Sequence, residues 1–329
     1  MSAAGPPQGG QAPSGGSVTA AGVERGGDLP AAGPPQGAKA PSGGSATAAG
    51  VERGGDMSAA GPSQGGQAPS GGSVTAAGVE RGGDMSQILR IATYNIHKGV
   101  QGIGPARRLE IHNLALAIET LDADIVCLQE VRAANRREAR RFAHWPDLPQ
   151  AEFLAPEGYQ SVYRTNAVTR HGEHGNALLS RWPVVRHRHE DISDHRFEQR
   201  GLLHAEVRVA GSLLHVIVVH FGLIPGSRQR QTQQLRRYIA REIGLDAPVV
   251  VAGDFNDWGT RVRQALRVDS LHAFAGPRTL TYPSRLPVAQ LDHIYARGLC
   301  PLSLAAPRGR AWGSMSDHLP LIAEFRMPA

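Results

Sequence analysis

Short apolar segments that end in a polar side chain recur throughout residues 85 to 329 of this sequence. The stretch "PVVVAGDFND" shows the pattern, because three valines lead directly into Asp254, Asn256 and Asp257. A β-branched run of this length, bounded by turn residues, is typical of a buried strand. A chain with many such segments must bury them in sheets, so this pattern limits the possible folds before any motif is considered.

The pattern predicts eight strands, at residues 89 to 95, 124 to 130, 176 to 180, 202 to 209, 213 to 220, 248 to 254, 291 to 296 and 319 to 325. Apolar residues at helical spacing predict helices over 107 to 121 and 228 to 243, the second with Ser227 as its N-cap and Gly244 just after its end. The two strands joined by "AGS" predict a hairpin. Hairpins mixed with strand-helix-strand units indicate an α/β fold with mixed sheets.

Residues 1 to 84 differ in kind, since they are three tandem copies of a 28-residue unit rich in Gly, Ala and Pro. The copies hold no aromatic residue, no Ile and a single Leu, so they cannot bury enough apolar surface to offset chain entropy. We expect this segment to be disordered, with a tether or partner-binding tail as the less favoured role. "MS" opens two copies and recurs at Met85, which suggests duplication around a start site and Met85 as a real or alternative initiator.

Residues 85 to 329 are long enough for one domain with a large core. Without the four basic and six acidic residues of the repeats, 31 basic and 23 acidic residues remain, and Lys98 is the single lysine. Arginine suits bidentate phosphate contacts. A GC-rich genome would favour arginine codons equally well, so charge alone supports an anionic substrate only weakly.

Two observations bear on the cellular setting. Cys127 and Cys300 are too few and too far apart for a disulfide framework or a thiolate metal site. The sequence contains no 18-residue apolar run and begins without the charged and apolar regions of a signal peptide. We therefore expect a cytoplasmic protein without an integral membrane segment, acting as a monomer.

Polar residues gather at the ends of the predicted strands: Asn95, Glu130, His220, Asp254, Asn256, Asp292, Asp317 and His318. One such residue is usually a cap or turn former, but rigid strand ends that carry several are where sites are commonly built. Oxygen ligands without a thiolate cluster favour Mg²⁺, or Mn²⁺, over structural zinc. Motifs typical of metalloproteases, P-loop proteins, dinucleotide-binding proteins and serine hydrolases are absent from the sequence. Metal-assisted hydrolysis is the chemistry that remains.

Five segments stand in a fixed order: "IATYNIH", "IVCLQEV", "VVVAGDFND", "LDHIY" and "SDHLPL". Together they resemble the signature of the endonuclease/exonuclease/phosphatase superfamily, which includes the DNase I-like nucleases, and they span nearly all of residues 88 to 326. "YNIHKG", "HGNALLSRWP", "RGLLHAEV" and "AGDFNDW" are most similar to a compact bacterial branch of uncertain substrate. The resemblance implies a four-layer α/β sandwich, in which two mixed β-sheets pack face to face between helices and the site lies at one end.

The resemblance also implies roles for these residues. Glu130 would be the principal Mg²⁺ ligand, with Asn95 and Asp317 close to the metal or its waters. Asp254 would orient or deprotonate the attacking water, and Asn256 would hold a phosphate oxygen.

Histidines have a second set of implied roles. His318, oriented by Asp292, would contact the phosphate or act as base, which leaves Asp254 and His318 both open as the general base. His220 would stabilise the transition state or serve the leaving group. Arg200 would bind phosphate, and Tyr163 and Asn176 are further candidates for substrate binding.

Weaker candidates flank these motifs. Arg164, Asn166 and His174 could line the cleft, against ordinary packing roles. Arginines follow Glu130 closely at positions 132, 136, 137, 140 and 141, and the spacing predicts that Arg132, Arg136 and Arg140 share a helix face. That face could follow a phosphate backbone, although a solvated charged face is the favoured interpretation. Asp257 should point away from Asp254 if the extended alternation continues, which predicts a structural role.

The favoured function is Mg²⁺-dependent hydrolysis of phosphodiester bonds by a nuclease. Hydrolysis of a phospholipid head group or a small phosphate ester is the alternative, because 245 residues leave little room for a long DNA-gripping insertion. A non-catalytic binding module is disfavoured because the site residues are all retained. The sequence lacks the tryptophan-cysteine-aspartate-arginine motif of phosphoinositide 5-phosphatases and the lysine that follows the motif glutamate in abasic-site endonucleases, so the substrate stays open.

Overall fold

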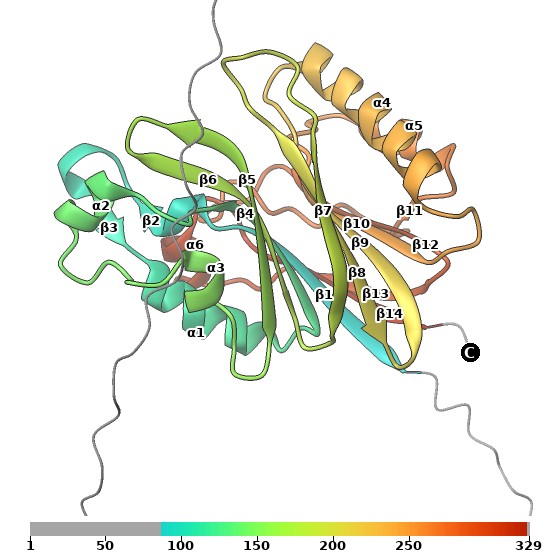
Figure 1. The fold of residues 1–329 in the computed structure, drawn as a ribbon, viewed down its shortest axis with the longest axis horizontal. Coiled ribbons are helices and arrows are strands. Elements are labelled where there is room, and N and C mark those ends of the chain that lie inside the picture. The colour runs from blue at the N-terminus through green and yellow to red at the C-terminus, as the bar shows by residue number, and fades with distance from the viewer. Residues whose placement is uncertain (1–86, 328–329) are drawn as a thin grey trace, which may run out of the picture. The chain divides into compact units, whose positions relative to one another are not determined.

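The structure, a computed structural model, describes residues 87–327. The predictions for residues 1 to 84 and for Met85 lie outside the described residues. Two six-stranded sheets face each other in the described domain (Figure 1). The order is β13-β14-β1-β4-β6-β5 in the first sheet and β11-β12-β10-β9-β8-β7 in the second. Both sheets are mixed, so the predicted α/β class with two mixed sheets is confirmed.

The strands of the first sheet are β1 (Ile88–Asn95), β4 (Ile125–Val131), β5 (Gln160–Thr169), β6 (Gly172–Ser180), β13 (Cys300–Ala305) and β14 (Leu321–Arg326). Those of the second sheet are β7 (Val184–Asp191), β8 (Gly201–Val209), β9 (Ser212–His220), β10 (Val249–Asp254), β11 (His272–Ala273) and β12 (Asp292–Arg297). A separate ribbon pairs β2 (Val100–Gln101) with β3 (Arg108–Leu109). All eight predicted strands are present, and β8 and β9 form the predicted hairpin.

The centres of the two sheets share one arrangement. β1 is parallel to β4 and antiparallel to β14, and β10 is likewise parallel to β9 and antiparallel to β12. A helix makes each parallel crossover, α1 (Ile111–Leu121) between β1 and β4 and α4 (Pro225–Glu242) between β9 and β10. The carboxyl ends of four central strands therefore form two adjacent pairs, one in each sheet.

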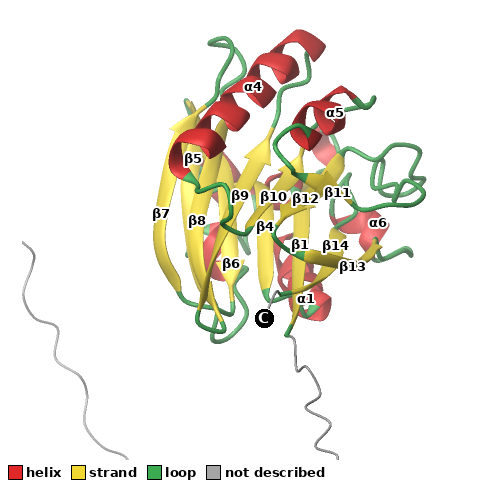
Figure 2. Ribbon diagram, turned by 90° about the vertical axis from the view of Figure 1, so that its right-hand side faces the viewer, coloured by secondary structure: helices red, strands yellow, loops and turns green. Residues whose placement is uncertain are grey.

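Alternation along the strands produces a core between the sheets and a core on each outer face. In β9, Val216 and Val218 face the first sheet, whereas Ile217 and Val219 face α4. Full burial of each such side chain contributes about 1.5–3 kcal/mol. Figures 1 and 2 show α4 and α5 (Arg261–Arg267) over the second sheet. Figure 1 shows α1, α3 (Gln150–Phe153) and α6 (Trp312–Met315) beside the first sheet. The described domain thus has the predicted four layers.

Both predicted helices have different first residues from those expected. The first begins at Ile111 rather than at residue 107, because Arg108 and Leu109 pair with β2. The second begins at Pro225, whose fixed φ suits the first turn of a helix. Ser227 lies inside this helix and its hydroxyl donates to Asp194, so the predicted N-cap is wrong.

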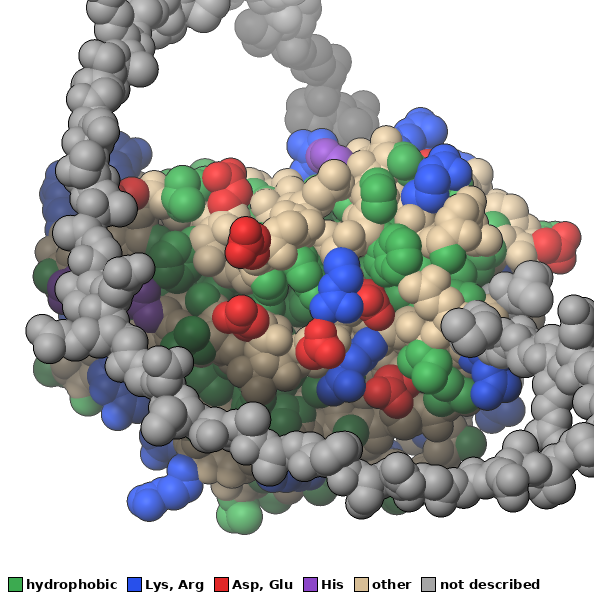
Figure 3. Space-filling view, turned by 90° about the horizontal axis from the view of Figure 1, so that it is seen from below, with side chains coloured by type: hydrophobic (Ala, Val, Ile, Leu, Met, Phe, Trp, Pro, Cys, Tyr) green, Lys and Arg blue, Asp and Glu red, His purple; other side chains and the backbone are tan. Residues whose placement is uncertain are grey.

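The surface of the described domain is mixed in character. Seen from below, acidic, basic and apolar side chains lie side by side (Figure 3). Within residues 87–327, no helix combines the length and apolar character needed to cross a membrane.

Candidate active site

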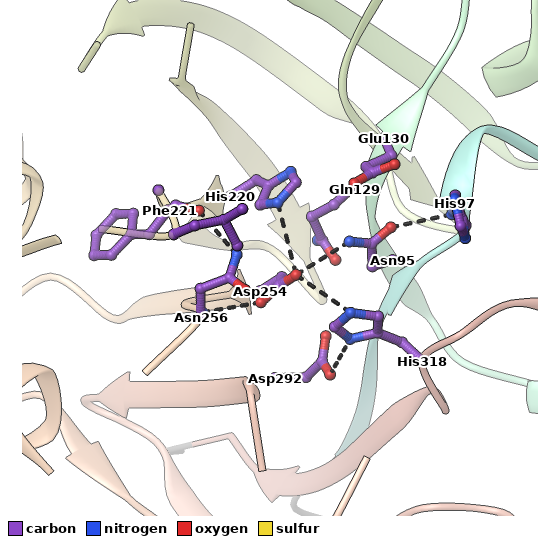
Figure 4. Close-up of polar contacts among 12 residues, drawn as sticks. Asn95, His97, Gln129, Glu130, His220, Phe221, Asp254, Asn256, Asp292 and His318 are labelled. Carbon is purple, nitrogen blue, oxygen red and sulfur yellow. Dashed lines mark hydrogen bonds and ion pairs between the residues drawn. The ribbon is translucent and has the colours of Figure 1, made fainter. Parts of the chain in front are cut away.

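The polar residues at the strand ends meet at one end of the two sheets (Figure 4). Asn95 ends β1, and its side chain contacts Asp254, which ends β10 in the opposite sheet. His220 ends β9 and is the register partner of Asp254. Asp292 begins β12 beside Asp254, because β12 runs antiparallel to β10. The two sheets together therefore supply the site, and neither could form it alone.

Asp254 is the centre of this cluster, with 1% of its surface exposed. Its Oδ2 accepts a hydrogen bond from Asn95 Nδ2 at 3.1 Å and lies 3.6 Å from Nε2 of both His220 and His318. Its Oδ1 accepts from the backbone N–H of Asn256 at 2.9 Å. Burial raises the pKa of the Asp254 carboxyl to about 7, while His318 acts in the opposite direction. A carboxyl group with this pKa can exchange a proton near neutral pH.

The two histidines beside Asp254 differ in protonation. Burial tends to lower the pKa of His318, but Asp292 and Asp254 outweigh it and the pKa rises to about 10. Asp292 Oδ2 lies 2.8 Å from His318 Nδ1 and also accepts from the Thr281 hydroxyl at 2.6 Å. In His220, burial and then Arg200 hold the pKa well below its ordinary value. The site therefore pairs an imidazolium with a neutral imidazole, the kind of separation that assigns acid and base roles.

Glu130 is placed by a β-bulge. The register between β4 and β6 shifts between Leu128 and Val131, and Glu130 has a φ of 57°. Its carboxylate accepts from Lys98 Nζ at 2.6 Å. Burial raises the pKa of Glu130, but Lys98, His220 and His97 together bring it below its ordinary value. Glu130 is therefore an ionised carboxylate.

Backbone strain is concentrated at this end of the domain. Four of the seven non-glycine residues with a left-handed backbone in the described chain lie here: His97, Lys98, Glu130 and Asn256. Such conformations cost on the order of 1–3 kcal/mol each, and they persist where surrounding contacts hold them. Their clustering is typical of a functional site.

The donor set suits a hard divalent cation. Burial raises the pKa of Asp317, but His97, whose Nδ1 lies 3.1 Å from the Asp317 carboxylate, and His318 together bring this pKa below its ordinary value. Glu130 and Asp317 thus offer ionised oxygens, and Asn95 offers an amide oxygen. The ligand atoms of Asp254, Asp292 and His318 also lie within 4.8 Å of one another. Because His318 and Asp292 already bond to each other, we assign that trio to a hydrogen-bonded relay.

Asn256 and Asp257 separate into two roles at the end of β10. Asn256 is buried, and its Nδ2 donates to the Phe221 carbonyl at 3.0 Å. The Asp257 carboxylate accepts from the backbone N–H groups of Gly259 and Val262, each at 3.2 Å. Asp257 therefore holds the turn that leads into α5, as its predicted structural role requires.

Two other predicted residues lie at the junction of the sheets. Arg200 Nη2 donates to Glu198 at 3.1 Å and Nε to the Phe221 carbonyl at 3.3 Å, which places the guanidinium near His220. Asn176, in β6 of the first sheet, donates its Nδ2 to the carbonyls of Gly201 at 2.9 Å and Val218 at 3.2 Å in the second. The amide hydrogens of Asn176 thus join the two sheets and help to hold them in place relative to each other.

The weaker candidates differ in their distance from the cluster. Tyr163 packs against the outer core beside α3, and burial raises its pKa to about 12. Arg164 contacts His187 at 3.0 Å and Asn166 contacts His189 at 3.3 Å, both across the edges of the two sheets. Burial and then Lys98 lower the pKa of His174 to about 4, so His174 lies close to the cluster.

The arginines that follow Glu130 do not share one helix face, so that prediction is wrong. The helix α2 (Arg136–Arg141) begins only at Arg136. Arg132 lies before this helix and is buried, with its Nη1 4.0 Å from Glu138 Oε1. Arg136, Arg137 and Arg140 instead line a surface hollow of about 390 Å³.

Four residues that contact the cluster were not predicted from the sequence: His97, Lys98, Thr281 and Ser316. His97 and Lys98 follow Asn95 directly, and the Ser316 hydroxyl donates to the Asn95 carbonyl at 2.6 Å. The segment "YNIHKG" carried the signal for the first two, because it joins a strand end to the domain's single lysine.

Comparisons with known proteins agree with this geometry. The Endonuclease/Exonuclease/phosphatase family matches residues 92–318. Over 246 residues the chain is 37% identical to the uncharacterized protein YbhP of Escherichia coli (strain K12), a match that covers 72% of this chain and 96% of YbhP.

Solved structures share the fold. An endonuclease/exonuclease/phosphatase from Beutenbergia cavernae DSM 12333 is similar with a TM-score of 0.57 and 23% identity, covering 74% of this chain and 72% of that one. D. rerio TDP2 complexed with single strand DNA product is similar with a TM-score of 0.53 and 18% identity, covering 73% of this chain and 99% of that one. From the matched residues, the identity to YbhP and the shared fold, the chain belongs to the endonuclease/exonuclease/phosphatase family.

Proposed function

We propose that the protein is a Mg²⁺-dependent phosphodiesterase that cleaves nucleic acid. The family is one of phosphoesterases that act on phosphodiester bonds. The observation that carries the proposal for this chain is the position of Asp254, whose Oδ2 is contacted by Asn95, His220 and His318 from both sheets. A buried carboxyl group with a pKa near 7 and three polar neighbours is suited to orient a water molecule and remove its proton.

The neighbouring side chains take complementary tasks in this proposal. His318 is cationic, so it can donate Nε2–H to a phosphate oxygen, and Asp292 fixes the ring through Nδ1. His220 is neutral and can accept or donate a hydrogen bond at the phosphate. The protonation of His318 favours Asp254 over His318 as the base. Arg200, close to His220, adds positive charge for the anionic substrate.

Glu130 and Asp317, with the amide oxygen of Asn95, would hold Mg²⁺, or Mn²⁺ as a substitute. When bound, the metal would supply positive charge that neutralises the phosphate. Lys98 donates a hydrogen bond to Glu130, and its long, flexible side chain can turn away from the carboxylate when a metal binds there.

Nucleic acid is the favoured substrate because exposed arginines gather near the site end, around α2 in particular. The structural similarity to a DNA-bound TDP2 points in the same direction. A phospholipid head group or small phosphate ester is the alternative substrate.

A substrate panel tests the proposal. The full chain with Mg²⁺ would be offered bis-p-nitrophenyl phosphate, single-stranded, duplex and abasic oligonucleotides, and sphingomyelin vesicles, with Asp254→Asn as the control against contaminating activity. We expect hydrolysis of the generic diester and of at least one oligonucleotide, and loss of both in the variant. Hydrolysis of the diester or the lipid without any nucleic acid would refute the nuclease assignment. Activity on none of these substrates would refute the phosphodiesterase assignment.

A further inference from the structure

A cavity of about 820 Å³ lies beside the catalytic cluster and takes no part in the chemistry described above. Four arginines from three separate segments line it: Arg108, Arg285, Arg308 and Arg310. The four are exposed at the surface. Arg108 lies 3.4 Å from Glu110, whereas Arg285, Arg308 and Arg310 have no carboxylate within ion-pair distance among residues 87–327. The cavity therefore concentrates uncompensated positive charge.

Its wall is built onto the backbone of the active site. The Ser284 backbone N–H donates to the Asp317 carbonyl at 2.7 Å, and the Ser284 hydroxyl donates to the Ser316 carbonyl at 2.6 Å. Arg285 Nε donates to the Gly313 carbonyl at 3.3 Å, which fixes the stem of its guanidinium. A ligand in this cavity would thus lie next to Asp317 and His318, in a defined position relative to the reacting phosphate.

Guanidinium groups are the side chains best matched to phosphate, because their fork of N–H donors bonds two oxygens at once. A substrate with one phosphate, bound at Asp254, has no second charge to place among these arginines. A polynucleotide has one on every nucleotide. The volume is within the range of small-molecule sites, so a nucleotide unit fits.

Aromatic side chains close to His318 favour a nucleotide over a lipid head group. The ring of Tyr282 lies 4.9 Å from that of His318, and the ring of Trp258 lies 6.0 Å from that of Tyr282. Trp258 is 58% exposed, which leaves much of its indole free for stacking. Exposed aromatic rings next to basic grooves are typical of proteins that bind single-stranded nucleic acid.

We propose that this arginine-lined cavity is a subsite that binds a flanking phosphate of a polynucleotide substrate. The inference rests on the proposed function and extends it, because it says how a chain of nucleotides is distinguished from a small diester. The subsite contributes binding and register, while Asp254 and its neighbours perform the chemistry.

The test removes two of the unpaired arginines together. In Arg308→Ala/Arg310→Ala we expect KM for a single-stranded oligonucleotide to rise at least tenfold with kcat nearly unchanged. Hydrolysis of bis-p-nitrophenyl phosphate, which has no second phosphate, should keep its wild-type rate. Oligonucleotide binding, measured by fluorescence anisotropy in an Asp254→Asn background, should show a log-log salt slope smaller by about 0.7, the change expected for one lost phosphate contact on a single strand.

The matched control is Arg186→Ala/Arg208→Ala, which removes the same charge from exposed positions on β7 and β8. It should keep the wild-type KM and salt slope. An unchanged slope in the cavity variant, or an equal fall in the control, would overturn the subsite. A matching loss of diester hydrolysis would also overturn it, because it would mean that the variant damages the catalytic cluster.

Two further outcomes separate this inference from the proposed function. If the wild type cleaves the diester but the cavity variant alters only binding to anionic phosphatidylglycerol vesicles, the polynucleotide subsite is wrong while the phosphodiesterase stands. If the wild type hydrolyses nothing, yet the cavity arginines govern oligonucleotide binding, the subsite stands and the proposed activity fails.

Discussion

His204 offers a quantitative test of how burial governs charge in this fold. Its ring is 1% exposed on the outer face of β8, where Nδ1 lies 2.9 Å from the Tyr238 hydroxyl and Nε2 lies 3.0 Å from His215 Nδ1. Burial, followed by His215 and Arg188, lowers the pKa of His204 to about 4. A histidine in an unfolded chain titrates near about 6.5. Between these two values the unfolded state binds the extra proton, so stability falls as the pH is lowered.

The magnitude follows from linkage. Between pH 7 and pH 5, a histidine with these two pKa values makes the free energy of unfolding smaller by about 2 kcal/mol. In His204→Gln the stability difference between pH 7 and pH 5 should shrink by about this amount, even though the variant is less stable at pH 7. Urea unfolding of the full chain at both pH values, followed by circular dichroism, measures the difference.

The control is His272→Gln, which replaces an exposed histidine in β11 and should keep the wild-type pH dependence. A lowered pKa of His204 would be refuted if His204→Gln lost the same stability between pH 7 and pH 5 as the wild type. That result would mean that His204 is protonated in the folded state or that the site relaxes around the charge.

Three further predictions address the site. Asp292→Asn removes the negative charge 2.8 Å from His318 Nδ1, so we expect kcat on bis-p-nitrophenyl phosphate to fall by about 10²–10⁴ with little change in KM. A kcat within threefold of the wild-type value would contradict the positioning role of Asp292. Gly253→Ala would place Cβ 1.9 Å from the Val219 carbonyl oxygen, so the free energy of unfolding, measured in urea, should fall by about 1–3 kcal/mol. Gly244→Ala, which has open space around Cβ, should leave the free energy of unfolding nearly unchanged. Glu130→Gln should raise the Mg²⁺ concentration for half-maximal activity at least tenfold, as measured by metal titration after chelation. If this Mg²⁺ concentration were unchanged, Glu130 would not be a metal ligand.

The sequence predicted the centre of the fold well because central strands have a strong local pattern. β1, β4, β9 and β10 are buried on both faces, so their apolar runs are nearly continuous, and the polar residue that ends each run marks the sheet edge. The candidate site follows from the same pattern, since parallel neighbours bring their carboxyl ends together. The strand-end pattern therefore marks Asn95, His220 and Asp254 as candidates for a single site.

Edge strands and long-range contacts could not be predicted in this way. β5, β7 and β13 lie at or next to the sheet edges and are largely exposed, so their sequences lack an apolar run. The ion pair of Lys98 with Glu130 depends on a bulge that no local pattern encodes. Asn176 bonds two carbonyls of the opposite sheet, and a contact of that kind depends on how the sheets pack.

The place of β14 in the first sheet determines when the site can form. β14 pairs with β1, although nearly the whole domain separates the two strands in sequence. Pairing across such a distance is slow, because a long loop must close before the contact stabilises it. Asp317 and His318 lie just before β14, so both reach the cluster only when that pairing is made. We therefore expect the site to be completed late in folding, and in a refolding experiment any hydrolytic activity should return no earlier than the β1–β14 ladder.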